Sequence, residues 1–384
     1  MLAIPLKYKH YSSCQSLNPV KVKSISIRNF KQFDSLEVSF ENKTLGEISD
    51  RFLILGDNGS GKTTLLQAIA LPLALATGRI PDISEFDWTG FLPGRYWRRG
   101  EPRIQVEVSF TEAELQATRD IARQWYDAQP EETRPRTFIE PGDSREVTLV
   151  LNGDTWKAGN TLAERVQFRG RYYAQWFIKR GDQSVRSRFR DLPGIFWFDQ
   201  FRNLSSHSTS EGTGDSISQR STKTSFESGV GQLRQYLINW HDRQRPGQTD
   251  SYLNQLETLY NRVFPDRVFV GTERLPSLES PTDESAYFLI QDEQHQYDIA
   301  EMSAGEQAVF PILYEIVRQQ IAYSIVLVDE VDLNLHPPAA QFLVKQLPRI
   351  APTCQFIVTT HSEAASSIVG EDETYRLLGG ALCL

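Results

Sequence analysis

The feature that most constrains this chain is the segment RFLILGDNGSGKTTLLQAIA, in which a glycine-rich turn joins a short apolar run to a helical pattern. Residues 51–56 predict a buried strand and residues 62–78 predict a helix. The pattern GxxxxGK[ST] therefore lies in the strand–turn–helix context that a phosphate-binding loop requires. The alternative is a glycine-rich turn that matches by accident, and it leaves the flanking strand and helix unexplained.

The glycine-rich turn predicts a site for ATP and Mg²⁺. Glycines allow backbone N–H groups to face phosphate oxygens, and the helix N-terminus adds partial positive charge. Lys62 would reach the β- and γ-phosphates, and Thr63 would place its hydroxyl on Mg²⁺. The residues expected to contact the nucleotide are Gly56, Asp57, Asn58, Gly59, Ser60, Gly61, Lys62, Thr63 and Thr64.

A second apolar run, SIVLVDE, predicts another buried strand, with Asp329 and Glu330 at its carboxyl end. Open parallel sheets bind their ligands at this edge. We expect Asp329 to hold Mg²⁺, directly or through water, and Glu330 to polarise the attacking water in phosphoryl transfer. A strand that simply ends in two solvated acids is the alternative, which the upstream phosphate loop makes less attractive.

The segment EMSAGEQAVF predicts a second anion site. Ser303 and Glu306 have capping-box spacing, so a helix should begin at Ala304 with its N-terminus open to an anion. Because the chain already has one phosphate loop, this site, with Ser303, Gly305 and Glu306, would serve a different ATP. A plain helix cap is the alternative. Pro311 is expected to bend or restart the helix.

The segment QFIVTTHS predicts a further buried strand that ends at Thr360 and His361, on the same sheet edge as Glu330. His361 would donate a hydrogen bond to the γ-phosphate. The alternative for a lone histidine at a strand end is a structural role.

In their order along the chain, GDNGSGKT, SAGEQ, IVLVDE and VTTHS resemble the motifs of ABC-type ATPase heads of the SMC, RecF and OLD families. The N-terminal ISIRNFKQFDSLEVSF is similar to the strand pair with which those heads begin, and DEVDLNLHP resembles their DE-x-x-LHxHP segment. The resemblance covers about 21–75 and 300–380. It implies an α/β fold: a P-loop head with a parallel sheet, an N-terminal antiparallel β subdomain and an inserted α+β lobe.

The resemblance also implies roles for individual residues. Ser303 and Gly305 would contact the ATP of the opposite subunit in a head-to-head homodimer, and Asp332 would lie in the loop that links the two sites. The Q-loop glutamine, a catalytic and Mg²⁺-binding position, would be Gln200, which follows an apolar strand in IFWFDQFRN. An ordinary surface glutamine is the alternative. The chain departs from the family by having SAGEQ where an SGGQ-like sequence is usual.

Changes of pattern along the chain predict its organisation. In the interval that we interpret as an inserted lobe, RIQVEVSF, REVTLVLNG and RYYAQWFIKR predict strands around one helix at TEAELQATRDIARQWYDAQ. The expected segments are an N-terminal arm (1–20), a first ATPase part (21–79), the inserted lobe (80–200), a Ser/Thr/Gly-rich loop (201–230), a helical and β connecting region (231–299) and a second ATPase part (300–384).

Composition and the distribution of apolar and cysteine residues favour a protein of the cytoplasm over a membrane or secreted protein. No apolar run is long enough to span a membrane, and the N-terminal stretch lacks the continuous apolar segment of a secretory signal. The three cysteines, Cys14, Cys354 and Cys383, are too far apart in sequence for a disulfide framework and fit a reducing cytoplasm. The net charge of -8 argues against a protein that coats nucleic acid by bulk electrostatics.

One basic stretch in the expected lobe nevertheless fits a nucleic-acid surface, because arginines interleaved with aromatic side chains suit a single strand or a backbone groove. A solvated face over an aromatic core, or a protein-binding surface, is the alternative. The basic residues are Arg165, Arg169, Arg171, Lys179, Arg180, Arg186, Arg188 and Arg190.

The spacing of the motifs separates this chain from several ABC ATPases. It lacks the heptads of an SMC protein, and the residues after His361 leave no room for the Toprim nuclease of OLD proteins. Its layout resembles free-standing antiphage ATPases, namely PtuA of Septu and the ATPases associated with retrons. We therefore expect a homodimer, or a higher oligomer, whose ATP state controls a nuclease or toxin effector. A RecF-like DNA-binding ATPase in repair and an ATP-stabilised scaffold with little turnover are the alternatives.

Overall fold

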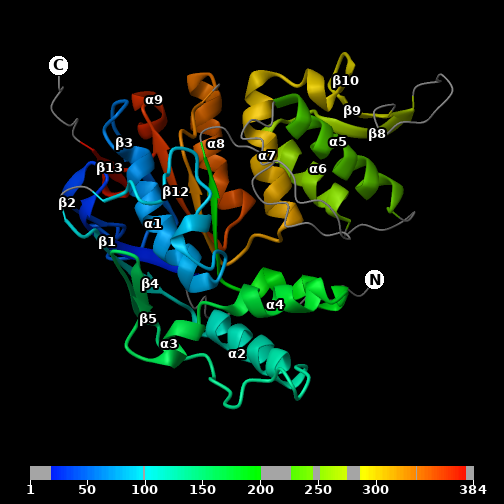
Figure 1. The fold of residues 1–384 in the computed structure, drawn as a ribbon. Coiled ribbons are helices and arrows are strands. Elements are labelled where there is room, and N and C mark those ends of the chain that lie inside the picture. The colour runs from blue at the N-terminus through cyan, green and yellow to red at the C-terminus, as the bar shows by residue number, and fades with distance from the viewer. Residues whose placement is uncertain are drawn as a thin grey trace, which may run out of the picture.

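The computed structural model describes residues 19–97, 100–199, 226–244, 251–274, 286–333 and 335–377. Its centre is a five-stranded sheet in the order β13-β3-β12-β11-β7, in which all neighbouring strands run parallel (Figure 1). Every residue of the three strands β7, β11 and β12 is buried, as expected for a parallel sheet covered on both faces. The strands are β3 (Arg51–Leu55), β7 (Gly194–Phe198), β11 (Ser324–Val328), β12 (Cys354–Thr360) and β13 (Thr374–Arg376).

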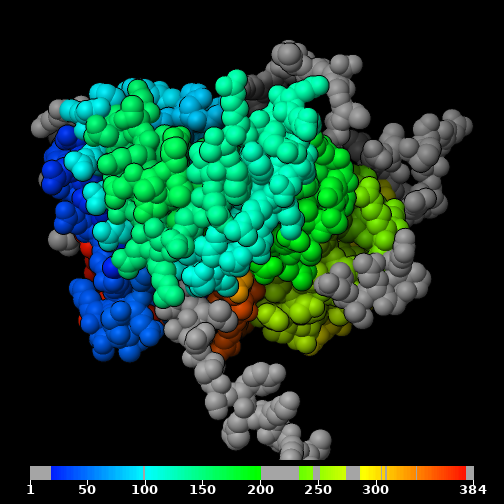
Figure 2. All heavy atoms as spheres, turned by 90° about the horizontal axis from the view of Figure 1, so that it is seen from below, coloured from blue at the N-terminus to red at the C-terminus, as the bar shows by residue number. Residues whose placement is uncertain are grey.

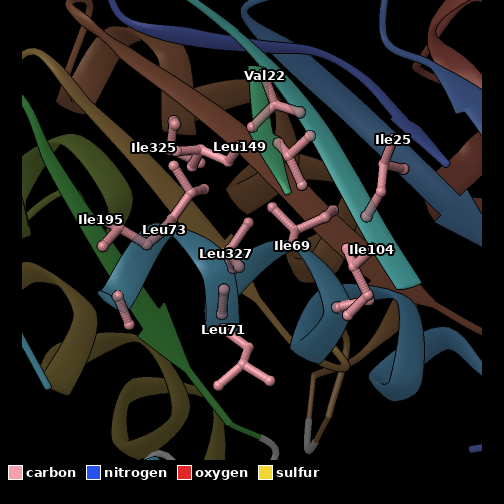
Figure 3. Close-up of a cluster of buried hydrophobic side chains, with 14 of the residues drawn as sticks. Val22, Ile25, Ile69, Leu71, Leu73, Ile104, Leu149, Ile195, Ile325 and Leu327 are labelled. Carbon is pink, nitrogen blue, oxygen red and sulfur yellow. The ribbon is translucent and has the colours of Figure 1, made fainter. Parts of the chain in front are cut away.

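Alternate side chains of the parallel strands enter two different hydrophobic cores. Ile325 and Leu327 lie in a core with helix α1 (Lys62–Thr77) and the antiparallel sheet described next (Figure 3). Val326 and Val328 lie in the opposite core, which contains α7 (Ala304–Arg318) and α8 (Pro337–Ile350). Helices α1 and α7 therefore cover opposite faces of the parallel sheet.

A five-stranded antiparallel sheet in the order β2-β1-β4-β5-β6 packs against α1. A register shift between Val22 and Ser24 places Val22, Ile25 and Ile27 together in the core. Simple alternation would place Val22 on the opposite face from the two isoleucines, and the bulge brings it to the same face because it adds one residue to the strand. The strands are β1 (Lys21–Phe30), β2 (Phe33–Ser39), β4 (Arg103–Ser109), β5 (Glu146–Asn152) and β6 (Thr155–Ala158).

A three-stranded antiparallel sheet, β10-β9-β8, lies with two helices on the α7 side of the molecule (Figure 1). The two helices are α5 (Phe226–Asp242), which begins before the expected connecting region, and α6 (Tyr252–Val263), which lies inside it. The strands are β8 (Val268–Arg274), β9 (Ala286–Gln291) and β10 (Gln296–Asp298).

Helices α2 (Glu112–Asp127) and α4 (Gly170–Lys179) belong to a third part of the fold, which covers much of the face seen from below in Figure 2, and α3 (Leu162–Val166) contacts β6 of the antiparallel sheet. The segment RYYAQWFIKR was predicted as a strand, and this was wrong. Its buried residues, Arg171, Tyr173 and Ala174, follow a helical period, because α4 packs against Ile121 and Ala122 of α2 in a small core. Strand-forming aromatic residues misled the prediction, and tertiary packing overrode their propensity.

The interval 80–200, expected as one inserted lobe, is divided among several parts of the fold. Strands β4, β5 and β6 join the antiparallel sheet, and β7 completes the parallel sheet next to β11. Only α2, α4 and the 3₁₀ segment Gln183–Asp191 share the third core. The predicted α/β class with a parallel sheet and an N-terminal antiparallel subdomain is confirmed.

Some sequence expectations concern the ends and loops. Pro311 was predicted to bend or restart α7; the helix continues through it as one element, so the restart is wrong and the bend stays a prediction. The predicted arm lies outside the described residues except for 19–20. The Ser/Thr/Gly-rich loop lies outside them up to residue 225, and α5 begins at Phe226.

The remaining short elements are α9 (Glu363–Ser366) and 3₁₀ turns at Ile83–Glu85, Ile299–Glu301 and Glu371–Glu373. Among the described residues, no helix is long and apolar enough to cross a membrane.

Arg171 joins the third part of the fold to the carboxyl end of α7. The side chain is buried, and its guanidinium donates hydrogen bonds of 2.8 to 3.3 Å to five backbone carbonyls. Burial lowers the pKa of Arg171 to about 9. The acceptors are the carbonyls of Phe189, Leu192, Gln319, Gln320 and Ala322.

We expect Arg171→Ala to lower the free energy of unfolding by about 3 kcal/mol, because it leaves buried carbonyls without donors. Arg180→Ala is the matched control: Arg180 is exposed and stacks on the Trp176 ring at 3.9 Å, so its loss should cost less than about 1 kcal/mol. Urea unfolding curves measure both variants. Equal destabilisation of the two would contradict a structural role for Arg171.

Candidate nucleotide site

The glycine-rich turn connects the end of β3 to the start of α1, as the sequence predicted. Gly59 and Gly61 have φ angles of 80° and 105°, which favour glycine. A Cβ added to Gly61 would lie 2.5 Å from the side-chain nitrogen of Gln32. Lys62 is buried, and its ammonium donates to the carbonyls of Gly56 at 2.8 Å and Asp57 at 3.0 Å. The loop thus curls around a lysine, which fits a cradle for phosphate groups.

Gln32 is a site residue that the sequence analysis missed. It lies in the turn between β1 and β2, where its amide donates to the Gly59 carbonyl at 3.1 Å and accepts from the Thr64 hydroxyl at 3.1 Å. The antiparallel sheet therefore supports the glycine-rich turn directly. Its sequence context, KQF at a predicted hairpin turn, carries no signal for this contact.

Asp329 connects the three central elements of the site. Its carboxylate accepts 2.6 Å hydrogen bonds from the hydroxyls of Thr63 at the start of α1 and Thr359 near the end of β12. Burial raises the pKa of the Asp329 carboxyl, although the two hydroxyls and Lys62 act to lower it. Thr359 was not predicted as a site residue, even though it precedes the predicted Thr360 and His361.

The Thr63 hydroxyl and the Asp329 carboxylate are oxygen donors of the kind that Mg²⁺ prefers. Within the part of the chain that the structure describes, no group of three or more His, Cys, Asp and Glu side chains could hold a metal ion. Thr63 and Asp329 would supply two oxygen ligands to Mg²⁺, a cation that usually keeps several waters and binds substrate phosphate.

Glu330 follows Asp329 in an unusual backbone conformation. Its φ angle is 46°, in the left-handed region that a non-glycine residue rarely adopts. Its backbone N–H donates to the Thr359 hydroxyl at 2.7 Å. One threonine hydroxyl thus fixes both acids, accepting from the backbone of Glu330 and donating to the side chain of Asp329. Strain of this kind occurs where the surrounding structure holds a residue in a functional position.

His361 follows β12 on the same edge and has 53% of its side chain exposed. Its Nδ1 lies 3.5 Å from a carboxylate oxygen of Asp332, which is buried. Asp332 therefore faces the histidine of its own chain and is placed to orient the ring.

Ser303 and Gly305 begin α7 on the other face of the parallel sheet from α1. Ser303 is exposed and forms the predicted capping box with Glu306. A Cβ on Gly305 would lie 3.3 Å from a methyl carbon of Leu335, so this turn packs on the segment after Asp332. Glu306 differs from the expectation of a nucleotide contact: it is buried, and its carboxylate accepts hydrogen bonds from residues of its own chain.

Comparison with known families shows to which protein family the chain belongs. Residues 52–367 match the family model described as "AAA domain, putative AbiEii toxin, Type IV TA system". The match includes the glycine-rich turn, the acids after β11 and His361. The chain belongs to this family of AAA domains.

Named relatives of this AAA domain are ATPases of retrons and a Septu protein. The Retron Vc95 probable ATPase of Vibrio cholerae serotype O1 biovar El Tor is 21% identical over 398 residues, covering 92% of this chain and 73% of that protein. The Retron Ec83 probable ATPase of Escherichia coli is 21% identical, covering 94% of this chain and 72% of that protein. Septu protein PtuA of Bacillus mycoides (strain KBAB4) is 22% identical, covering 89% of this chain but 38% of that protein. The predicted resemblance to these proteins is confirmed.

Solved structures similar to this AAA domain include two SMC heads. The SMC head domain from Thermotoga maritima has a TM-score of 0.41 at 16% identity, covering 91% of this chain and 92% of that chain. The SmcHead bound to the C-winged helix domain of ScpA has a TM-score of 0.43 at 14% identity, covering 90% and 91%.

Gln200, the predicted Q-loop residue of this AAA domain, lies outside the described residues. Its neighbour Asp199 is described, follows β7, and accepts a 2.5 Å hydrogen bond from the Thr89 hydroxyl. The charge of Asp199 also contributes to raising the pKa of Asp329, after burial. Asp199 was missed because the resemblance directed attention to the glutamine, although the same apolar strand precedes both residues.

The predicted basic stretch of this AAA domain is not exposed throughout. Arg171 is buried, and Arg165 stacks on the Trp156 ring at 4.5 Å. Lys179, Arg180 and Arg188 are exposed at the end of α4 and in the following 3₁₀ segment. The exposed members of the stretch lie in its second half.

The backbone strain at Glu330 is testable with two variants that both remove the carboxylate. Glu330→Gly should be more stable than Glu330→Ala by about 1 kcal/mol, because glycine adopts the left-handed region without steric cost. At Gln116 in the second turn of α2, the same pair of substitutions should give the opposite order, with alanine more stable by about 1 kcal/mol. Thermal unfolding measures all four variants. If alanine is as stable as glycine at position 330, the strain is absent.

Proposed function

We propose that this chain binds ATP and Mg²⁺ at the glycine-rich turn, hydrolyses ATP, and closes with a second copy into a head-to-head dimer around two ATP molecules. The observation that carries the proposal is the 2.6 Å hydrogen bond from Thr63 to Asp329, because it joins the two expected Mg²⁺ ligands from distant parts of the chain. The similarity to two proteins named probable ATPases supports the same activity.

The side chains at the sheet edge divide the chemistry among them. Lys62 offsets the charge of the β- and γ-phosphates, and Mg²⁺, when bound, neutralises charge on the phosphate oxygens. Glu330 orients the attacking water, and the Thr359 hydroxyl fixes its backbone in the left-handed conformation. His361 donates to the γ-phosphate, and the Asp332 carboxylate on its Nδ1 side orients the ring.

The position of α7 supports the proposed dimer. Its N-terminus offers Ser303 and Gly305 on the opposite face of the sheet from α1, so these residues serve the ATP held by the other copy. Each ATP is then bound between two chains, and neither copy has a complete site alone. Assembly beyond the dimer and location in the cytoplasm stay predictions.

ATP binding should convert Glu330→Gln from monomer to dimer, because the amide leaves ATP binding intact but removes the carboxylate that orients water. Light scattering should show a doubled mass with ATP and Mg²⁺. Lys62→Ala added to the same variant should stay monomeric, which controls for dimerisation independent of the phosphate site. A Glu330→Gln protein that binds ATP and remains monomeric would refute the dimer.

We further propose that the ATP state of this dimer controls a partner effector, a nuclease or toxin, in antiphage defence. Support comes from the retron and Septu relatives, whose similarity extends over 89% to 94% of this chain. A RecF-like DNA-binding ATPase is the second candidate, and the exposed Lys179, Arg180 and Arg188 favour it. A scaffold with little turnover is the third, and the presence of Glu330 argues against it.

The partner experiment separates these candidates. Purified with the proteins encoded beside it, the chain should retain one of them, and its release should depend on ATP. DNA should leave the hydrolysis rate unchanged. Strong stimulation by DNA, lost in a Lys179→Ala, Arg180→Ala, Arg188→Ala triple variant, would instead establish the RecF-like alternative. Negligible hydrolysis with every partner present would favour the scaffold.

A further inference from the structure

Glu306 lies in the first turn of α7, three residues after Ser303, and its carboxylate connects two groups of residues. The side chain is buried, with 4% of the residue exposed, and accepts five hydrogen bonds. A simple capping box needs only the bonds to the cap residue. The additional donors therefore call for an explanation beyond helix initiation.

The two oxygens of the Glu306 carboxylate have different partners. Oε2 accepts from the backbone N–H of Ser303 at 2.9 Å and from its hydroxyl at 2.7 Å. Oε1 accepts from the Tyr260 hydroxyl at 2.6 Å, the Tyr297 hydroxyl at 2.8 Å and the Arg267 Nε at 3.3 Å. Oε2 thus bonds to Ser303, the residue predicted to contact ATP, and Oε1 bonds to residues outside the P-loop core.

Those outer partners belong to the three-stranded sheet and the helix beside it. Tyr260 lies in α6, Tyr297 lies in β10, and Arg267 immediately precedes β8. Next to Tyr297, Asp298 is also tied into this subdomain: its carboxylate accepts from the backbone of Phe288 in β9 at 2.9 Å and pairs with the Arg234 guanidinium of α5. A displacement of the subdomain is therefore transmitted to Oε1 through several rigid contacts.

Only a carboxylate can make both sets of bonds. The Ser303 N–H and the Arg267 Nε–H are obligate donors, one on each side, so both oxygens must accept. Burial raises the pKa of Glu306, but hydrogen bonds from Tyr260, Ser303 and Tyr297 outweigh it, and the net pKa is below the ordinary value. A glutamine would turn an NH₂ group toward one of the two obligate donors and break the connection on that side.

We propose that Glu306 is a positioning residue through which α6 and the β8–β10 sheet set the geometry of Ser303, and hence the strength of ATP-driven dimerisation. The inference rests on the proposed head-to-head dimer and deepens it: a protein partner bound to this subdomain would control dimer closure without touching the phosphate loop. Because Oε1 and Oε2 belong to one rigid group, movement of Tyr260 or Tyr297 reorients the Ser303 hydroxyl.

The test uses the full chain in the Glu330→Gln background, with two measurements. Light scattering gives the ATP concentration for half-maximal dimer, and a fluorescent ATP analogue at low protein concentration gives binding to the phosphate loop of the monomer. Glu306→Gln should raise the dimerisation midpoint at least about tenfold, which corresponds to about 1.4 kcal/mol, and leave analogue binding within about twofold. Tyr260→Phe should act in the same direction with a smaller effect, and it decides the question if Glu306→Gln does not fold.

Two comparisons distinguish positioning from general damage. Tyr314→Phe is the matched control, because this tyrosine is buried in the same helix and its hydroxyl has no hydrogen-bond partner among the described residues; its midpoint should not change. Ser303→Ala should raise the midpoint, and adding Glu306→Gln to it should have little further effect, since both changes remove one interaction.

The outcomes are separable. If the Glu330→Gln parent dimerises and Glu306→Gln dimerises equally well, the positioning role is refuted while the proposed dimer stands. Full additivity with Ser303→Ala, or an equal loss of analogue binding, also refutes it. A parent that binds ATP but never dimerises refutes the proposed dimer and this inference with it.

Discussion

The hydrogen bonds from Thr63 and Thr359 to Asp329 are the interaction on which the rest of the site depends. They join the first turn of α1 to the ends of β11 and β12, although Thr63 and Asp329 are separated by 266 positions in the chain. A buried carboxylate is costly unless its oxygens are hydrogen-bonded, so this contact constrains where α1 can begin relative to the sheet. Thr359 also fixes the neighbouring Glu330, because the Thr359 hydroxyl accepts a hydrogen bond from the backbone N–H of Glu330.

The parallel sheet separates two groups of residues that, in the proposed dimer, contact different ATP molecules. One face carries α1 and the antiparallel sheet, and the other carries α6, α7 and α8, with a separate hydrophobic core on each side. Both cores contain large, fully buried side chains, so the two helix N-termini are held on rigid supports. The antiparallel sheet supports the glycine-rich turn through Gln32, and the β8–β10 sheet supports Ser303 through Glu306.

Sequence reasoning succeeded where consecutive residues carry the signal. The parallel strands, the glycine-rich turn and the Ser303 capping box each depend on a few neighbouring residues whose spacing is read directly. It failed at α4, because the aromatic residues of that segment favour strands while their burial against α2 imposes a helix. Sequence reasoning also placed Arg171 on a solvent-facing surface, whereas its guanidinium is buried among backbone carbonyls in the structure.

The sequence alone determined the phosphate-binding turn, the two acids after β11 and the family resemblance. Each of these signals depends on residues that are adjacent in the chain. Only the tertiary structure decided that Gln32 and Thr359 belong to the site, and that Glu306 faces inward rather than toward a nucleotide. The physical reason is that a polar side chain bonds to whatever donor or acceptor packing brings near it. For these residues the partners lie on other elements, and no local pattern records them.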